Sequence, residues 1–117
     1  MKDFILLFRF PVGNKFYNNS ASPEEFQTEA LKWQKWMEGL VKDGRITPGQ
    51  QLSTSAAKVI SGSKKVVQDG PFAEGKEIVG SHCTIKARDL SEALEIAKSC
   101  PVLDQDGSVE VRGMTTS

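Results

Sequence analysis

The chain has 117 residues, of which 38% are hydrophobic and 26% are charged, a balance typical of one globular domain and not of a disordered chain. Lysine plus arginine and aspartate plus glutamate both number 15, so the formal net charge is zero. This balance excludes the basic excess of nucleic-acid binders and of proteins held electrostatically on membranes. We therefore expect a single domain over residues 1–117, without a nucleic-acid or membrane partner.

An apolar run near the start of the chain predicts the first β-strand. Residues 3–10 read DFILLFRF, a run that is too short for a transmembrane helix and is interrupted by Arg9. The run also lacks a signal-peptide cleavage pattern, so we expect a cytoplasmic protein. One face of the strand carries Phe4, Leu6, Phe8 and Phe10, and the other carries Ile5 and Leu7. Two apolar faces are typical of a central strand that is covered on both sides.

A long helix is predicted from Ser22 onward, after a loop over residues 11–20. Ser22 is a favoured N-cap, Pro23 suits the first helical position, and Glu25 completes a capping box. An apolar stripe at helical spacing follows, formed by Phe26, Ala30, Trp33, Met37 and Leu40 and widened by Leu31, Trp36 and Val41. We therefore expect a helix that buries a broad face and ends at Asp43-Gly44.

The middle of the chain predicts further strands. Residues 45–53 surround Pro48 and predict a bent or bulged strand, which the proline limits to a sheet edge or to an irregular start. Two β-branched runs, residues 58–60 and 65–67, flank a turn that contains glycine and predict a hairpin with lysines on both arms. After a sharp turn at residues 69–72, residues 78–87 predict a second central strand. One face of that strand would carry Cys83, Ile85 and Ala87, and the other His82, Thr84 and Lys86.

The end of the chain predicts a second helix and a last strand. Asp89 to Glu92 form another capping box, and the helix is expected to end at Cys100-Pro101. Its expected inner face consists of Leu90, Ala93, Leu94 and Ala97. A polar turn over residues 104–107 leads to the alternating run 109–112, which predicts the final strand.

These elements predict an α+β, ferredoxin-like fold with an inserted β-hairpin. Without the hairpin the order is β-α-β-β-α-β, which places both helices on one face of an antiparallel sheet. The other face would then expose the second apolar side of the first strand as a patch. We therefore expect a homodimer in which two copies pack sheet to sheet.

His82 is the only histidine, so a metal site with several histidines is excluded. It could act as a general acid or base if a partner side chain oriented its ring, and Asp69 is the first candidate for that partner, with Glu110 and Arg112 behind it. The alternative is an ordinary sheet histidine without a catalytic role. Asp69 likewise has a structural explanation, because Asp-Gly-Pro-Phe is a turn sequence in which Phe72 could plug the core.

Other residues offer binding rather than catalysis. Arg112 could hold an anion, Phe72 could line a pocket rim, and Trp36 could line a cleft or the dimer contact, whereas Trp33 is expected in the core. The two cysteines, Cys83 and Cys100, form no C-x-x-C pair and are expected to be inert packed thiols. No dinucleotide loop, P-loop, G-x-S-x-G motif or zinc-ligand spacing occurs, so we expect no cofactor and no metal.

Five stretches, in the same order along the chain, resemble the YCII-related family, and in particular its D-G-P-F branch. They are the W-x-x-W-M pattern at residues 33–37, Gly44-Arg45-Ile46, the D-G-P-F turn at residues 69–72, Asp89 to Ala93, and Val109 to Arg112. The resemblance implies a ferredoxin-like subunit that pairs into a dimeric α/β barrel, a fold similar to that of muconolactone isomerases.

The resemblance implies two functional settings. The wider family is associated with small-molecule chemistry at a histidine and aspartate near a cleft, and the D-G-P-F branch with extracytoplasmic-function sigma factors. The histidine that the wider family can carry on its long helix has no counterpart in this chain, where Trp33 occupies that region. The strand after the D-G-P-F turn usually opens with two glycines and an aromatic residue, whereas here it reads Gly80-Ser81-His82. We therefore expect a module that binds a small-molecule ligand or a protein partner. The alternative is a lyase-like or isomerase-like enzyme that uses Asp69 and His82.

Overall fold

The computed structural model describes residues 1–16 and 20–115. Its elements follow the chain as β1 (Lys2–Pro11), α1 (Pro23–Lys42), β2 (Ile46–Gln51), β3 (Lys58–Ser61), β4 (Val66–Asp69), β5 (Ala73–Glu74), β6 (Glu77–Ala87), α2 (Leu90–Lys98), the 3-10 helix η1 (Pro101–Gln105) and β7 (Ser108–Gly113). Within these ranges neither α-helix combines the length and the apolar character that crossing a bilayer requires.

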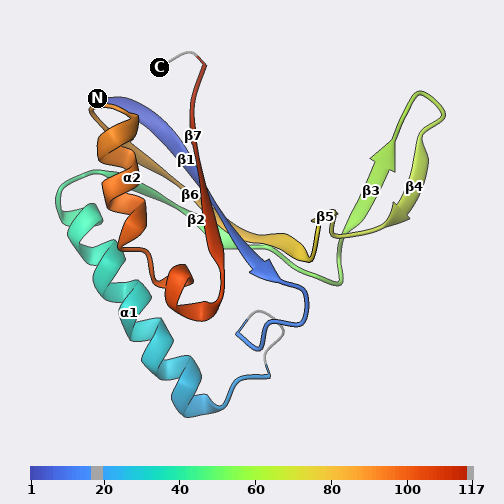
Figure 1. Cartoon of the computed structure of the whole chain (residues 1–117), viewed down its shortest axis with the longest axis horizontal. Coiled ribbons are helices and arrows are strands. Elements are labelled where there is room, and N and C mark those ends of the chain that lie inside the picture. Colours follow the sequence, from blue (N-terminus) through green and yellow to red (C-terminus); the bar gives the residue numbers. More distant parts are fainter. Residues whose placement is uncertain (17–19, 116–117) are drawn as a thin grey trace.

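The main sheet is antiparallel and has the order β2-β6-β1-β7, with the short β5 also paired to β6. Both helices contribute side chains to one core on one side of this sheet (Figure 1). The sheet is open, because β2 and β7 lie at its two ends, so one copy does not form a closed barrel. The α+β class, the antiparallel pairing and the edge position of β2 were all predicted.

The two central strands alternate as their sequences predicted. Four side chains of β1 are buried on the helix side: Phe4, Leu6, Phe8 and Phe10. They pack with Cys83, Ile85 and Ala87 of β6 and with Ala93 and Ala97 of α2. On the other face Ile5 and Leu7 are only half-buried, so a single copy covers β1 fully on one side and not on both.

Helix α1 begins as predicted but does not bury a broad face. Ser22 Oγ accepts a hydrogen bond from the Glu25 amide at 3.1 Å, and the Glu25 side chain accepts one from the Ser22 amide at 3.1 Å. None of the residues of α1 is buried, however, and Leu31 and Val41 are 51% and 56% exposed. The helix meets the core mainly through the bulky rings of Trp33 and Trp36, which hold its backbone away from the sheet.

Helix α2 packs more closely, and through fewer residues than predicted. Ala93 and Ala97 are buried, whereas Leu90 and Leu94 are 51% and 41% exposed, so the prediction was wrong for the two leucines. Small side chains let the helix approach the sheet, and the leucines then lie at the flanks of the contact. The Asp89 side chain accepts from the Glu92 amide at 2.9 Å, as a capping residue should. The Glu92 side chain accepts from the Arg88 amide at 3.0 Å and not from that of Asp89, so only half of the predicted capping box forms.

Strands β3 and β4 form the predicted hairpin as a separate two-stranded sheet that extends away from the main sheet (Figure 1). Asp69 lies at the end of β4, where its carboxylate pairs with the Lys58 ammonium. Phe72, in the turn that follows, is 73% exposed. The expectation that Phe72 plugs the core was therefore wrong. The turn that carries Phe72 follows the projecting hairpin and lies away from the core on the helix side of the sheet.

Candidate functional site: a cavity beneath helix α1

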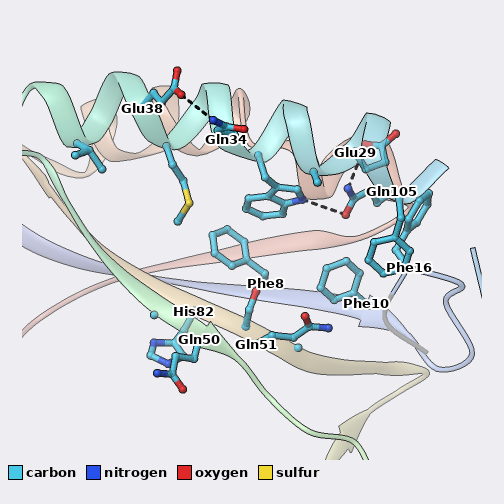
Figure 2. A pocket seen from close by; sticks show the side chains of 18 of the residues that line it. Phe8, Phe10, Phe16, Glu29, Gln34, Glu38, Gln50, Gln51, His82 and Gln105 are labelled. Atoms are coloured by element: carbon cyan, nitrogen blue, oxygen red, sulfur yellow. Dashed lines mark hydrogen bonds between the residues drawn. The ribbon is translucent and has the colours of Figure 1, made fainter. Parts of the chain in front are cut away.

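A cavity of about 840 Å³ lies between α1 and the main sheet (Figure 2). It exists because α1 stands off the sheet and leaves its apolar stripe uncovered. The apolar part of the wall is formed by Phe8, Phe10, Phe16, Phe26, Ala30, Trp33, Met37 and Val41. Polar side chains interrupt this wall at Glu29, Gln34, Glu38, Lys42, Gln50, Gln51, Ser81 and Gln105. A cavity of this size and composition is typical of small-molecule sites.

Aromatic rings fix the shape of the wall. The rings of Phe8 and Trp33 meet edge to face, with centroids 5.1 Å apart and an interplanar angle of 83°. Phe16, from the loop before α1, meets Phe26 of the helix with centroids 6.4 Å apart. Edge-to-face pairs stabilise one arrangement beyond the burial of their area. The wall is therefore largely formed before any ligand arrives.

Gln105, at the end of η1, closes one end of the cavity with polar atoms. It is 4% exposed, and its Nε2 donates to Glu29 Oε2 at 3.1 Å while its Oε1 accepts from Trp33 Nε1 at 3.4 Å (Figure 2). Its main-chain oxygen also accepts from Asn14 Nδ2 at 2.8 Å. This one side chain thus fixes a carboxylate and an indole of α1 relative to η1.

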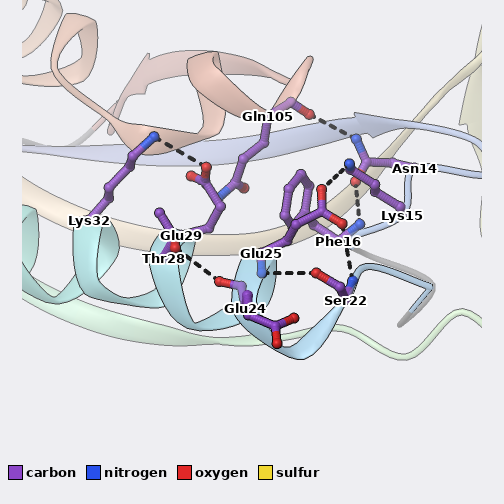
Figure 3. A network of polar contacts seen from close by, with 10 residues as sticks. All are labelled: Asn14, Lys15, Phe16, Ser22, Glu24, Glu25, Thr28, Glu29, Lys32 and Gln105. Atoms are coloured by element: carbon purple, nitrogen blue, oxygen red, sulfur yellow. Dashed lines mark hydrogen bonds and ion pairs between the residues drawn. The ribbon is translucent and has the colours of Figure 1, made fainter.

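The loop before α1 is tied to the same end of the cavity (Figure 3). The Lys15 ammonium pairs with the Glu25 carboxylate, and this hydrogen bond, followed by that from the Ser22 amide, holds the pKa of Glu25 below its usual range. Lys15 Nζ also lies 5.4 Å from the centroid of the Phe16 ring. The ring of Phe16, which lines the cavity, therefore has the Lys15 ammonium group near one of its faces.

The structure does not bring Asp69 and His82 together. His82 is half-buried and contributes to the cavity wall, and its ring lies beside Gln50, directed away from α1 (Figure 2). A Cβ on Gly49 would lie 2.1 Å from the main-chain oxygen of His82, so β2 passes this residue very closely. Asp69 belongs to the other sheet and pairs with Lys58 there.

The predicted binding residues are also dispersed. Arg112 is exposed on β7, opposite Ile5 and so on the sheet face away from the helices. Trp36 packs beneath α2 instead, where its Nε1 donates to Ser99 Oγ at 3.1 Å. Of the two tryptophans, Trp33 lines the cavity. Phe72 lies on the exposed turn after the hairpin.

The chain's thiols are unsuited to nucleophilic chemistry. Cys83 and Cys100 are free and buried, as predicted, and desolvation raises the pKa of each to about 12. Both therefore stay protonated at neutral pH. Across residues 1–16 and 20–115, no three histidine, cysteine, aspartate or glutamate side chains gather as a group of metal ligands.

Sequence reasoning missed the residues that shape the cavity. Gln105 lies in a stretch of turn residues, and nothing in that pattern marks one polar side chain for burial. Glu29 lies one position before Ala30 of the apolar stripe, and a glutamate at such a position is expected to be solvated. The useful signal was the aromatic content of the stripe, which was interpreted as core.

An open antiparallel sheet, two helices on one side of it and an aromatic cavity beneath the longer helix define an α+β domain with a small-molecule-sized site. The family model for the YCII-related domain matches residues 16–116, and the chain belongs to this family. A comparison with curated proteins gave no significant match.

Proposed function

We propose that this YCII-related domain is a binding module that holds an apolar, ring-containing small molecule in the cavity beneath α1. The observation that carries the proposal is the cavity itself, about 840 Å³ with a wall of aromatic and aliphatic side chains. Small-molecule sites have such volumes, with a few polar groups that orient the ligand. Here Gln105 and Glu29 supply those groups at one end.

The cavity exposes apolar surface to water. Phe26 is 38% exposed on the stripe of α1, and no residue of that helix is buried. Each Å² of apolar surface that a ligand covers contributes about 25 cal/mol. A ligand that covers this surface would therefore stabilise the helix against the sheet, and this stabilisation is measurable as a rise in the melting temperature.

The proposal is tested by calorimetric titration with tert-butylbenzene, a neutral ring compound. We expect binding to the natural chain and a loss of binding in Ala30→Leu, because Ala30 lines the cavity and a larger side chain would occupy it. Ala56→Leu is the matched control, because Ala56 is exposed in the loop before the hairpin and lies outside the cavity wall. Equal binding by both variants would contradict the proposal.

We also propose that two copies pair through the sheet face opposite the helices. Ile5 and Leu7 are half-buried there, beside the ion pair of Arg9 and Glu110. Leu7→Lys should turn a dimer into a monomer in analytical ultracentrifugation at micromolar concentration. Leu31→Lys, at a leucine 51% exposed on α1, should leave the dimer intact. A natural chain that sediments as a monomer would remove this part of the proposal.

The finer classification belongs to the same proposal. The sheet order β2-β6-β1-β7 supports a ferredoxin-like arrangement with an inserted hairpin, in which two copies would form a dimeric α/β barrel. The D-G-P-F turn at residues 69–72 and the W-x-x-W-M pattern at residues 33–37 support membership of the D-G-P-F branch. A cytoplasmic location and a setting beside sigma factors rest on the sequence and its resemblance alone.

The catalytic alternative needs Asp69 within reach of the His82 ring. The Asp69 carboxylate instead pairs with Lys58, at the end of a hairpin that extends from the main sheet. The binding module is therefore the function that we propose. Unchanged ligand binding in Asp69→Asn would agree with it, because Asp69 lies outside the cavity wall.

A further inference from the structure

Acidic side chains outnumber basic ones among the described residues of the cavity wall. Among the described residues of its wall, Glu29 and Glu38 are acidic and Lys42 is basic. Glu29 lies at the closed end, with its side chain 15% exposed, whereas Glu38 is an exposed residue further along α1. The most enclosed charge of the cavity is therefore a carboxylate.

The rings of the wall suit a cation. Aromatic faces attract ammonium groups within about 6 Å of the ring centroid, and aromatic cages are a recurrent way to bind quaternary ammonium ligands. The rings of Phe10, Phe16 and Trp33 line the same cavity as Glu29. One of these rings already has an ammonium group beside it, because Nζ of Lys15, which lies outside the cavity wall, is 5.4 Å from the Phe16 centroid.

Glu29 is held in place without being fully neutralised. Gln105 Nε2 donates to its Oε2 at 3.1 Å, and Lys32 Nζ lies 3.1 Å from its Oε1. The Lys32 side chain is 45% exposed and also lies 4.0 Å from Asp104 Oδ2, so its pair with Glu29 is a solvated one of small energy. A ligand cation inside the cavity would compete with Lys32 for the same carboxylate.

We propose that the ligand of this cavity is an organic ammonium ion, with its cationic group between Glu29 and the aromatic wall. The inference rests on the proposed function, since it requires that the cavity binds a small molecule at all. It goes further by assigning the ligand a positive charge. An aromatic carboxylate or another organic anion is thereby excluded as the preferred ligand.

The test compares two probes of nearly equal shape, phenyltrimethylammonium and tert-butylbenzene, by calorimetric titration at low ionic strength. They differ in a positive nitrogen at the centre of the branched group. We expect the ammonium probe to bind about tenfold more tightly, because the ring contacts and the carboxylate add to the shared apolar contact. Added salt should reduce this preference.

Three substitutions locate the effect. Glu29→Gln keeps an oxygen that can accept from Gln105 and removes the charge, so the preference for the ammonium probe should fall to about twofold or less. Glu24→Gln, an equal change of charge at an exposed position of the same helix outside the cavity wall, should leave it unchanged. Lys32→Gln should tighten ammonium binding about threefold, because it removes the competing cation, an effect that a purely structural role of Lys32 would not produce.

The outcomes separate this inference from the proposed function. If tert-butylbenzene does not bind up to its limit of solubility and the ammonium probe does not bind at millimolar concentration, the proposed function fails and this inference fails with it. If tert-butylbenzene binds as tightly as the ammonium probe, the cavity is a ligand site but the assignment of a positive charge to its ligand is wrong. If the ammonium probe is preferred equally by Glu29→Gln and the natural chain, the assignment of Glu29 is overturned.

Discussion

Gln105 Nε2 donates a hydrogen bond to Glu29 Oε2 at 3.1 Å, although 76 residues separate the two along the chain. The bond links η1 to the first part of α1 across the closed end of the cavity. Because α1 has no buried residue, polar contacts of this kind contribute more to its position than they would in a closely packed helix.

Replacing Gln105 by leucine should destabilise the protein by about 1–3 kcal/mol, because partners at the buried end of the cavity lose their hydrogen bonds. Urea denaturation followed by circular dichroism measures the change. Gln27→Leu is the matched control, since Gln27 is exposed on α1 and its loss should change the free energy of unfolding by less than about 0.5 kcal/mol. Equal midpoints for the two variants would show that the buried amide contributes nothing to stability.

Local signals in the sequence predicted the elements well, and long-range packing less well. Ser22 and Glu25 predicted the start of α1, and the alternation around Phe8 predicted which face of β1 is buried. Neither signal carries information on how far a helix stands from its sheet. That distance is set by Trp33 and Trp36, whose bulky rings lie between α1 and the sheet and keep the aliphatic side chains of the stripe from reaching the core.

The candidate site was harder to predict, for the same reason. The sole histidine and the Asp69 turn have side-chain chemistry that suggests catalysis, but the topology places them in separate sheets. Glu29 and Gln105 lie far apart in the sequence and have common residue types. Only the fold brings them together beside Trp33, so no local pattern could have identified them.

Gly49→Ala should destabilise the protein by about 1–3 kcal/mol, a typical effect of overpacking. Its Cβ would lie 2.1 Å from the His82 main-chain oxygen and 2.7 Å from the ring, so β2 would have to move away from β6. Gly39→Ala is the informative contrast, because Gly39 lies within α1 with open space around its missing Cβ. It should stabilise the protein by about 0.5–1 kcal/mol in the same denaturation experiment. A tolerated alanine at position 49 would refute the close approach of β2 to His82.

The buried thiols predict a loss of stability in alkali. Burial raises the pKa of Cys83 and Cys100 to about 12 in the folded protein, whereas an unfolded cysteine titrates near about 8.5. Between these values the unfolded chain releases thiol protons that the folded protein retains, so the free energy of unfolding falls as the pH rises. Urea midpoints at pH 8 and pH 10 measure the fall. It should be smaller in the variant with Cys83→Ala and Cys100→Ala, and an equal fall there would assign it to other groups.

The pair of Arg9 and Glu110 predicts a contribution in the opposite pH range. Arg9 Nη2 donates to Glu110 Oε1 at 2.8 Å, and this hydrogen bond lowers the pKa of Glu110 below its ordinary value of about 4.3. The contribution to stability is therefore present above that value and is lost as the pH falls through the folded pKa. An NMR titration of the Glu110 carboxyl should show the lowered pKa in the natural chain and an ordinary one in Arg9→Gln. Identical titrations would place the pair apart in solution.

The most direct measurement is a set of intermolecular nuclear Overhauser effects between tert-butylbenzene and the protein, with the two indole N–H signals assigned by Trp33→Phe and Trp36→Phe. A ligand in the cavity should give contacts with the Trp33 ring and with Met37, while Trp36, held beneath α2 by Ser99, gives weaker ones. Contacts confined to Ile60, Val67 and Phe72 would place the probe on the exposed hairpin region and contradict the cavity as the binding site.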